Sequence, residues 1–429
     1  MTKIGEKYSQ KLAEENFDAI IIGSGMSGLS TAAFLSKAGK KVLVLERHFK
    51  VGGWTHTFQR GQYEWDVGIH YIGAVGRKNA FLRKLFDEIT DERLEWASMS
   101  DNYDRMIFPD KSYNFVAGKE QFIDQMVEYF PKERDAIVKY LDLVKQCTSA
   151  STKFFMNRAM PKLLSDLTYG RMSRSFLEMS DKTTWDVLSS LTSNTELIGV
   201  LTGQYGDYGL TPKQSSFAIS AAVANHYLYG AYYPVGGSRM IAETIAPVIQ
   251  QSGGKIIVSA TVDEILVHKN RAVGVKLENG DEIRAPMVVS SAGVSITFGK
   301  LAKGVTSYNE KLSNVEPSCA HVCLYIGMNE TAENMGLENT NLWVYPGYDH
   351  DANVENYLND YSKSLPLVYM SFASAKDPQW VEKHGNTATM EAITLAPYEM
   401  FSKWEKTSWQ KRGADYDALK NELTNRLMK

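Results

Sequence analysis

Three glycines near the amino end have the spacing of a phosphate-binding loop. Gly23, Gly25 and Gly28 form the pattern G-x-G-x-x-G. In such a loop the first glycine permits a tight turn, the second lets a diphosphate approach the backbone, and the third lets a helix pack closely. Phosphate oxygens would then accept hydrogen bonds from free N–H groups at the positive end of that helix. The predicted phosphate-binding residues are Gly23, Ser24, Gly25, Met26, Ser27 and Gly28.

A carboxylate follows this loop at the position that a nucleotide site requires. Glu46 stands at the end of the next expected strand, beside Arg47. A carboxylate there can accept hydrogen bonds from both ribose hydroxyls of an adenosine, and it would repel a 2′-phosphate. Both residues are therefore assigned to a dinucleotide site that disfavours NADP. The alternative is a purely structural turn with an incidental glutamate.

A second pair of glycines bears on the choice between NAD and FAD, which share the first pattern. Gly52 and Gly53 come shortly after Glu46. A Gly-Gly pair there brings the backbone close to the diphosphate a second time, as the longer flavin dinucleotide needs. Trp54 and Thr55 complete this second loop. We therefore predict FAD as the cofactor, with NAD as the alternative.

The elements around these glycines form a βαβ unit. Residues 17–22 and 41–46 are short apolar runs that predict buried strands, and residues 26–38 carry apolar residues at helical spacing. Strand, glycine turn, helix and strand in this order make one βαβ unit. The fold class is therefore α/β, with a Rossmann-type dinucleotide-binding domain.

The rest of the chain predicts further elements in three groups. Residues 80–214 are mostly helical, and residues 238–252 predict a helix that Pro247 should kink. An amphipathic helix is expected over residues 416–427. Four strands lie between these helices, the middle two antiparallel, at residues 255–258, 262–268, 272–277 and 287–291. No second G-x-G-x-x-G follows a strand, so the electron donor is not visible in the sequence.

Composition narrows the class of protein. The 429 residues include 47 Lys and Arg against 50 Asp and Glu, a net charge of −3, which gives no support for nucleic acid as a partner. Three cysteines cannot form a disulfide framework, and no secretory signal is recognised, so we expect a reducing, cytoplasmic location. No apolar run approaches the length of a spanning helix, while peripheral contact with a membrane stays open.

Several stretches resemble one branch of flavoproteins. Residues 65–73 (WDVGIHYIG), read with residues 52–58 (GGWTHTF), resemble the retinol saturase branch of the phytoene-desaturase and carotenoid-isomerase family. The resemblance continues through residues 203–209, 232–238, 288–293, 374–380 and 397–404. It implies the glutathione-reductase-like form of the fold with an inserted α+β substrate domain. It also implies FAD and a polyene or isoprenoid-lipid substrate whose C=C bonds are saturated, desaturated or isomerised.

The resemblance also assigns further residues and a domain order. Val262 would contact the adenine through its backbone, and Trp54 stands where the double-glycine signature usually has an arginine. The expected segments are 17–79 and 228–296 for FAD binding, 80–227 for a mainly helical lobe facing substrate or membrane, and 297–429 for substrate-domain strands and helices.

The same resemblance leads us to expect that the flavin site is incomplete in this chain. Such proteins close the flavin site with a carboxyl-terminal glycine-rich segment, and residues 297–429 contain none. We therefore expect that this piece of the site is missing from the chain. A truncated, non-catalytic dinucleotide-binding module is the alternative of another class.

His70 and Tyr71 are the predicted catalytic residues. They lie just past the double-glycine loop. Saturation of an alkene by a reduced flavin needs hydride at one carbon and a proton at the other, and these two side chains can donate a proton. The alternative is that both residues only orient the loop.

Two other stretches carry weaker signals. Residues 151–178 mix Phe, Met and Leu with five basic residues, a pattern typical of an amphipathic helix pair on an anionic bilayer. The same pattern also fits solvated helices that cover their own core. Cys319, His321 and Cys323 would share one face of a strand, but a fourth ligand is not evident, so no metal site is predicted.

Overall fold

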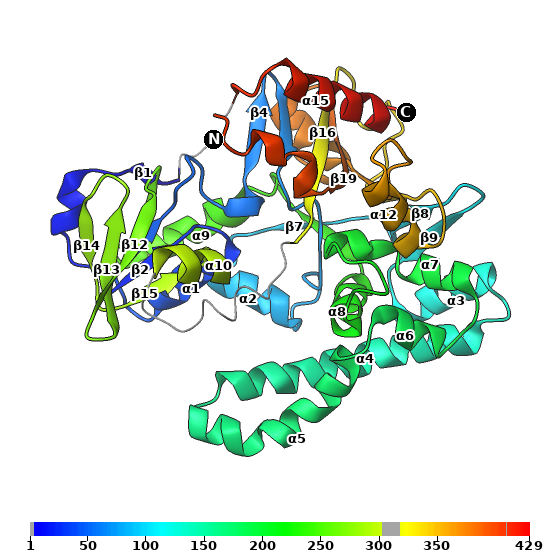
Figure 1. Cartoon of the computed structure of the whole chain (residues 1–429), viewed down its shortest axis with the longest axis horizontal. Helices are drawn as coiled ribbons and strands as arrows, with labels where there is room; N and C mark the ends of the chain where they lie inside the picture. Colours follow the sequence, from blue (N-terminus) through cyan, green and yellow to red (C-terminus); the bar gives the residue numbers. More distant parts are fainter. Residues whose placement is uncertain (1–3, 303–317, 409) are drawn as a thin grey trace.

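The computed structural model describes residues 4–302, 318–408 and 410–429. A nucleotide-binding lobe built on a parallel sheet lies beside a second lobe built on a mixed sheet and helices (Figure 1). Residues 303–317, which belong to the predicted segment 297–429, lie outside the described residues.

The parallel sheet carries the predicted βαβ unit. Its strand order is β1-β11-β3-β2-β15, and every neighbouring pair is parallel. Helix α1 (Met26–Lys37) connects β2 to β3, which confirms the predicted strand, helix and strand. The strands are β1 (Glu6–Lys7), β2 (Ala19–Ile22), β3 (Val42–Leu45), β11 (Lys255–Val258) and β15 (Val288–Ser290).

This strand order predicts a ligand-binding position at the carboxyl end of β2. Strand β2 pairs with β3 on one side and with β15 on the other, so the direction of strand order reverses at β2. In open α/β sheets, ligands bind outside the carboxyl ends of the strands at such a reversal. The carboxyl end of β2 leads directly into Gly23, the first glycine of the predicted phosphate loop.

Alternation along the strands divides the apolar side chains between two cores. Ile21 and Val44 lie in the core that packs against α1 and α9 (Met240–Gln251). Ile20 and Leu43 point to the opposite face, where a small antiparallel sheet covers them. That sheet consists of β12 (Val262–His268), β13 (Arg271–Leu277) and β14 (Glu282–Arg284). Pairing of β12 with β13 is antiparallel, as predicted.

The second lobe is built on a six-stranded sheet. Its order is β16-β19-β18-β17-β8-β9, with β17 and β8 parallel and the other pairs antiparallel. Strands β8 and β9 come from the segment that the sequence predicted as mainly helical. The strands are β8 (Asn102–Ile107), β9 (Ser112–Val116), β16 (Ala320–Met328), β17 (Asn341–Val344), β18 (Val368–Ser371) and β19 (Ala388–Ala396).

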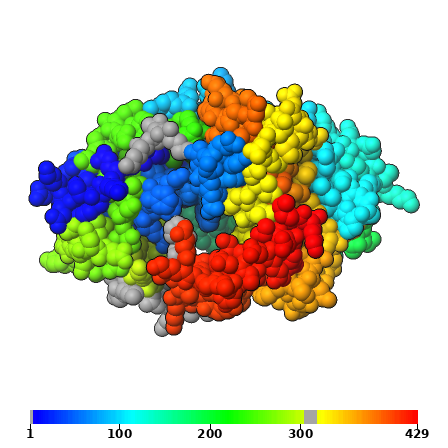
Figure 2. All heavy atoms as spheres, turned by 90° about the horizontal axis from the view of Figure 1, so that it is seen from above, coloured from blue at the N-terminus to red at the C-terminus, as the bar shows by residue number. Residues whose placement is uncertain are grey.

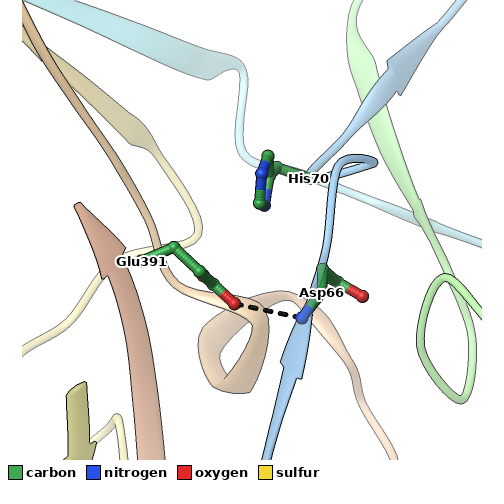
Figure 3. Close-up of side chains that lie close together, drawn as sticks. All are labelled: Asp66, His70 and Glu391. Carbon is green, nitrogen blue, oxygen red and sulfur yellow. Dashed lines mark hydrogen bonds between the residues drawn. The ribbon is translucent and has the colours of Figure 1, made fainter. Parts of the chain in front are cut away.

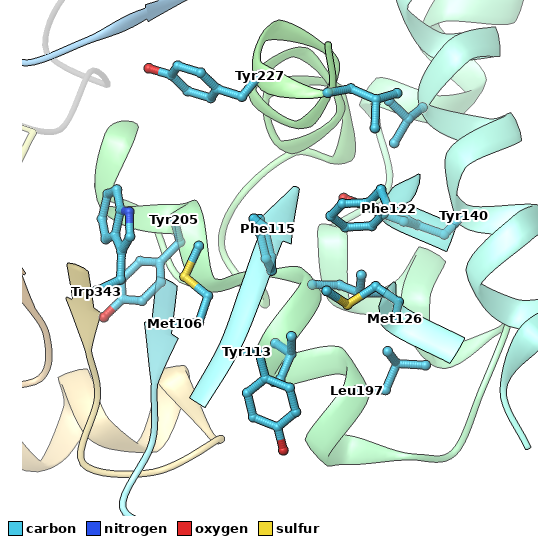
Figure 4. Close-up of a cluster of buried hydrophobic side chains, with 14 of the residues drawn as sticks. Met106, Tyr113, Phe115, Phe122, Met126, Tyr140, Leu197, Tyr205, Tyr227 and Trp343 are labelled. Carbon is cyan, nitrogen blue, oxygen red and sulfur yellow. The ribbon is translucent and has the colours of Figure 1, made fainter. Parts of the chain in front are cut away.

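Helices and an aromatic core surround this sheet. Figure 4 shows methionine and aromatic side chains from strands and helices filling the space, with Met106, Phe115 and Phe122 among them. The helices are α2 (Phe81–Thr90), α3 (Lys119–Tyr129), α4 (Arg134–Ala159), α5 (Lys162–Ser180), α6 (Thr184–Ser189), α7 (Thr195–Leu201) and α8 (Phe217–Tyr227). Helices α4 and α5 form a hairpin that extends away from both lobes (Figure 1).

Short elements join the two lobes. The hairpin of β4 (Thr57–Arg60) and β5 (Tyr63–Asp66) leads from the cofactor loops to the six-stranded sheet. A three-stranded sheet has the order β6-β10-β7. Its strands are β6 (Ile72–Gly73), β7 (Trp96–Ser98) and β10 (Ala231–Pro234).

The chain ends on the outside of the second lobe. The remaining helices include α12 (His350–Asn359), α13 (Ala373–Lys376), α14 (Trp380–His384) and α15 (Ala414–Leu427). In the space-filling view, the red carboxyl-terminal residues lie across the face that also shows the blue and yellow segments (Figure 2). Within the described ranges, no helix is long and apolar enough to cross a bilayer.

Candidate functional site

The first glycine loop has the geometry of a phosphate cradle. Gly23 has a φ of +96°, in the left-handed region, which permits the tight turn after β2. A Cβ on Gly28 would lie 2.1 Å from the Gly23 carbonyl oxygen, so only glycine lets α1 approach. A Cβ on Gly25 would meet nothing within 4 Å, which leaves open space at the start of α1. Gly25 offers no side chain to cap the helix, so its first N–H groups are free for an anion.

Ser24 and Glu46 connect this loop to the end of β3. The Ser24 backbone N–H and hydroxyl both donate to Glu46 Oε2, at 2.8 and 2.7 Å. Glu46 Oε1 accepts from the His48 backbone N–H at 2.8 Å. A carboxylate has about four acceptor positions, so Glu46 keeps capacity for a further donor such as a ribose hydroxyl. The hydrogen bonds hold the carboxylate beside the phosphate loop.

The double-glycine loop meets the first loop. Gly52 and Gly53 have φ values of +117° and +57°, and a Cβ on Gly53 would lie 2.9 Å from the Gly25 Cα. The Gly52 N–H donates to the Ser24 carbonyl and hydroxyl oxygens, at 3.1 and 3.2 Å. Thr55 is buried, and its hydroxyl donates to the Gly52 carbonyl at 2.9 Å. The two predicted loops therefore form one surface, and the residues present fit the diphosphate of a dinucleotide.

The other residues predicted for the cofactor lie around this surface. Ser27 is exposed on the first turn of α1, next to half-buried Met26. Arg47 is exposed beside Glu46. Val262 is buried at the start of β12, shortly after Ala260, whose N–H donates to the Glu46 carbonyl oxygen at 2.9 Å. Their contacts with FAD stay predictions.

A cavity begins where the double-glycine loop ends. It has a volume of about 860 Å³, and Trp54 lines it with a side chain that is 74% exposed. Both His70 and Tyr71 line it as well. The opposite walls come from α8 and from the six-stranded sheet, including Tyr227, Trp343, Leu367, Tyr369 and Ile393. The structure thus brings the two predicted catalytic residues to an apolar cavity next to the predicted cofactor loops.

His70 is a neutral side chain at this wall. Burial, with a smaller contribution from nearby Lys376, lowers the pKa of His70 from 6.5 to about 3. The His70 Nδ1 atom is buried and has no hydrogen-bond partner among the described residues. His70 therefore carries no charge near neutral pH, and it can donate a proton only from the neutral ring.

Tyr71 is held in place by hydrogen bonding and stacking. Its hydroxyl donates to Asp104 Oδ2 at 3.0 Å, and its ring stacks on Tyr227 with centroids 4.3 Å apart. Burial, followed by the charge of Asp104, raises the pKa of Tyr71 well above its usual value. Tyr71 therefore keeps its proton at neutral pH.

A buried polar network lies beneath His70. Asp66, at the end of β5, accepts from the Tyr233 hydroxyl at 2.5 Å and from the Ser238 N–H at 3.2 Å. The Asp66 N–H donates to Glu391 Oε1 at 3.2 Å, as the dashed line in Figure 3 shows. Ligand-type atoms of Asp66, His70 and Glu391 all lie within 4.8 Å of one another, close enough to surround a metal ion.

Lys376 supplies positive charge to this network. Its Nζ atom donates to the His70 carbonyl at 3.0 Å, to the Ser371 hydroxyl at 2.7 Å and to Asn341 Oδ1. Burial lowers the pKa of Lys376, while the charges of Glu391 and Asp66 oppose that shift. Burial also raises the pKa of Glu391 well above its usual value. The ammonium group thus offers the carboxylates the compensation that a metal ion would otherwise provide.

The stretches that carried the resemblance converge on this network. Asp66, Tyr233 and Lys376 come from residues 65–73, 232–238 and 374–380, and they surround one buried point. The sequence analysis did not single out Asp66, Lys376 or Glu391 as site residues. The sequence feature that could have identified such a residue is a charge inside an otherwise apolar run, as for Glu391 within β19 (ATMEAITLA).

The cysteines and histidine considered for a metal also reach the cavity. Cys319, which directly precedes β16, lines the cavity together with His321 and Cys323 of that strand. Burial raises the pKa of both thiols, with that of Cys323 at about 12. The three side chains therefore form part of the cavity wall.

The glycines of residues 199–209 serve packing. A Cβ on Gly199 would lie 2.5 Å from the Tyr348 carbonyl oxygen, and one on Gly206 would lie 2.7 Å from the Trp343 ring. The second glycine-rich stretch therefore lets α7 and the following 3-10 helix (Gly203–Asp207) press against the six-stranded sheet.

Comparisons with known proteins agree with these features. The family of flavin-containing amine oxidoreductases matches residues 26–298. The all-trans-retinol 13,14-reductase of Homo sapiens is 35% identical, over 99% of this chain and 72% of that protein. A Danio rerio protein described as an inactive all-trans-retinol 13,14-reductase is 32% identical, over 98% of this chain and 73% of that protein. A chloroplastic prolycopene isomerase of an Oncidium hybrid cultivar is 29% identical, over 67% of this chain and 50% of that protein.

Solved structures share the fold. An oxidoreductase from Methanosarcina mazei superposes with a TM-score of 0.63 at 17% identity, covering 95% of this chain and 84% of that chain. This likeness supports the predicted α/β class with a Rossmann-type domain. The match to the family and the sequence identity across nearly the whole chain show what this protein is. The chain is an FAD-dependent oxidoreductase of the flavin-containing amine oxidoreductase family, on the branch of the all-trans-retinol 13,14-reductases.

Proposed function

We propose that this chain saturates a C=C bond in a polyene or related isoprenoid lipid. The observation that carries the proposal is the cavity of about 860 Å³ that adjoins the double-glycine loop at Trp54. A volume in this range holds a drug-sized, mostly apolar ligand. Aromatic faces of Tyr227, Trp343 and Tyr369 line it and suit a flat conjugated chain. The name of the human relative, a reductase of all-trans-retinol, supports the same chemistry.

We propose FAD as the cofactor of this reaction. Its diphosphate would lie on the N–H groups of Gly25, Met26 and Ser27, with Glu46 on the adenosine ribose. The double-glycine loop would cover the diphosphate from the other side, and Val262 would contact the adenine. A single FAD molecule would contact both the double-glycine loop and the adjoining cavity, whereas NAD would not contact both. We therefore propose FAD rather than NAD.

The protein's own residues would hold the lipid and supply the proton. When bound and reduced, FAD supplies hydride to one carbon of the alkene. His70 and Tyr71 face the cavity, and we propose them as donors of the proton to the other carbon. His70 would donate from its neutral ring, and Tyr71 from a hydroxyl that Asp104 holds in place. The apolar wall would exclude water from the reacting bond.

The mass of the product tests this function. Purified protein with FAD, chemically reduced without oxygen, is offered all-trans-retinol, and we expect a product heavier by two hydrogens. His70→Phe should slow a single turnover about 100-fold while FAD affinity is unchanged. A product lighter by two hydrogens would identify a desaturase instead, and unchanged mass with a shifted double bond would identify an isomerase. Colourless protein that rejects FAD would support a non-catalytic module.

We further propose that the α4–α5 hairpin contacts an anionic membrane surface. At its tip, Phe155, Leu163 and Leu167 are 63%, 74% and 75% exposed. Residues 151–178 carry five basic and two acidic residues, a net charge of +3 in a chain whose total is −3. Apolar side chains at a projecting tip, flanked by positive charge, suit insertion among anionic headgroups. Such contact would bring a lipid substrate close to the enzyme.

A further inference from the structure

A buried carboxyl group lies next to His70, the first of the two proposed proton donors. His70 lines the cavity and is 8% exposed, whereas Glu391, on β19, is fully buried and does not line the cavity. Figure 3 shows the His70 ring next to the carboxyl groups of Glu391 and Asp66. A ring nitrogen of His70 and an oxygen of each carboxyl group lie within 4.8 Å of one another. One water molecule, or a small movement of the Glu391 side chain, bridges such a separation.

Each of these two side chains has a buried atom without a hydrogen bond. His70 Nδ1 and Glu391 Oε2 have no hydrogen-bond partner among the described residues. Glu391 Oε1, in contrast, accepts from the Asp66 N–H at 3.2 Å. Buried polar atoms are rarely left unpaired in native proteins. Because the two side chains adjoin, each unpaired atom is a natural partner of the other.

Of the ionisable groups at this point, Glu391 is the one with a proton to give. Lys376 donates all three of its protons to other acceptors, and both oxygens of Asp66 already accept hydrogen bonds. Burial raises the pKa of Asp66 only to about 6, but it raises that of Glu391 well above its usual value. Near neutral pH Glu391 thus carries a proton, while Asp66 is mostly ionised.

Donation from a neutral imidazole requires a second proton transfer. His70 is neutral near pH 7, so loss of its one ring proton would leave an imidazolate anion in an apolar wall. A proton that reaches the other ring nitrogen in the same step avoids this anion. Nδ1 is the buried ring nitrogen of His70, so the ring would donate to the cavity through Nε2 and accept through Nδ1.

We infer that Glu391 passes its proton to His70 Nδ1, directly or through one water molecule, as the Nε2 proton moves to a carbon of the alkene. This inference rests on the proposed function, because it names the source of the proton in that same saturation. The Nε2–H bond breaks as a C–H bond forms, and the Glu391 O–H bond breaks as the Nδ1–H bond forms. With hydride from the reduced flavin at the other carbon, the alkene gains two hydrogens. The negative charge left on Glu391 is stabilised by the ammonium group of Lys376, with which it interacts.

Glu391→Gln tests this relay with little change of structure. The amide is neutral, like the protonated carboxyl group, and its oxygen can still accept from the Asp66 N–H. Protein with reduced FAD is mixed with all-trans-retinol without oxygen, and the product heavier by two hydrogens is followed over a single turnover. We expect Glu391→Gln to slow this turnover about 100-fold, with unchanged affinities for FAD and retinol. In His70→Phe, the further change Glu391→Gln should have no effect, because the relay has lost its acceptor.

Infrared spectroscopy tests the proton on Glu391 without turnover. The oxidised, FAD-loaded wild type should show the C=O stretch of a protonated carboxyl group at pH 7 that Glu391→Gln lacks. Identical spectra in this region would overturn the inference, because Glu391 would then have no proton to give.

Controls separate the possible failures. Glu196→Gln changes a half-buried glutamate that accepts from the Tyr113 hydroxyl outside the cavity wall, and it should keep the wild-type rate. Wild-type protein that forms no heavier product would overturn the proposed function together with the inference. Equal rates in wild type and Glu391→Gln would overturn the inference alone. A slower turnover with weaker FAD affinity, or additive effects of the two changes in the double variant, would also overturn it, because Glu391 would then act on the fold rather than through His70.

Discussion

Asp104 is a buried carboxyl group of the site whose titration makes the unfolding free energy depend on pH. It accepts hydrogen bonds from Tyr71, Gln204 and Asn341. Burial raises its pKa from 3.8 to about 6. Because the folded state holds this proton more tightly than the unfolded chain, the group adds stability below pH 3.8 that is lost as the pH rises through about 6.

Asp104→Asn should therefore flatten the pH dependence of stability. Without a titrating group, the decrease in unfolding free energy between about pH 4 and pH 6 should shrink by about 3 kcal/mol. Urea denaturation at several pH values measures this decrease in both proteins. Asp124→Asn, at a side chain that is 77% exposed, is the matched control and should retain the wild-type slope. An equal slope in Asp104→Asn and wild type would contradict the assignment.

At the residue scale, local spacing predicted the cofactor loops but not the buried network. Gly23, Gly25 and Gly28 serve a turn and a helix within six residues, so their roles are readable from sequence. Asp66 and Glu391 meet across 325 positions of the chain. No local pattern links such residues, and a charge inside an apolar run does not reveal its partner.

At the element scale, the hydrophobic pattern predicted the positions of strands that consist mainly of apolar residues. The runs at residues 255–258 and 262–268 were predicted with the bounds of β11 and β12, and α15 begins two residues before its predicted start. Strand β8 (NYDRMI) was missed, because its buried residues Tyr103, Asp104 and Met106 do not alternate regularly with exposed ones and include a charged residue.

The α4–α5 hairpin gives the prediction that belongs to this scale. The double variant Leu163→Ser, Leu167→Ser should bind phosphatidylserine-containing vesicles at least about tenfold more weakly than wild type in a co-sedimentation assay. The reason is that each leucine that inserts into the membrane contributes about 2 kcal/mol to binding. Leu358→Ser, on the exposed face of α12, should not change binding. Wild-type protein that stays in the supernatant, or a double variant that binds normally, would remove the membrane proposal.

At the scale of the whole molecule, the Lys376 network joins the lobes. Asp66 lies on the hairpin that leaves the cofactor loops, while Lys376 and Glu391 belong to the lobe of the six-stranded sheet. The charges of both carboxylates favour the ammonium form of Lys376. Residues 80–227, which the sequence predicted as mainly helical, supply β8 and β9 to the sheet that also contains four strands of residues 297–429.

Lys376→Met should destabilise the whole protein. Removal of the ammonium group leaves the His70 carbonyl, the Ser371 hydroxyl and the Asn341 amide oxygen without their donor and removes a charge that compensates buried Asp66, so we expect the unfolding free energy at pH 7 to fall by about 3 to 5 kcal/mol. Lys403→Met removes an ammonium group that is 60% exposed and paired with Asp415, and it should cost less than about 1 kcal/mol. Denaturant titration compares the two. A small, equal loss for both variants would show that Lys376 does not stabilise the joined lobes.

The central claim is that the amino end of α1 holds the diphosphate of FAD, and Gly25→Val tests it most directly. The added Cβ would meet no protein atom within 4 Å, so the variant should fold. That space is where we place the diphosphate, so FAD affinity should fall about 100-fold, or about 2.7 kcal/mol. Gly170→Val, at another open glycine, should bind FAD as the wild type does. Equal FAD affinity in wild type and Gly25→Val would contradict the account.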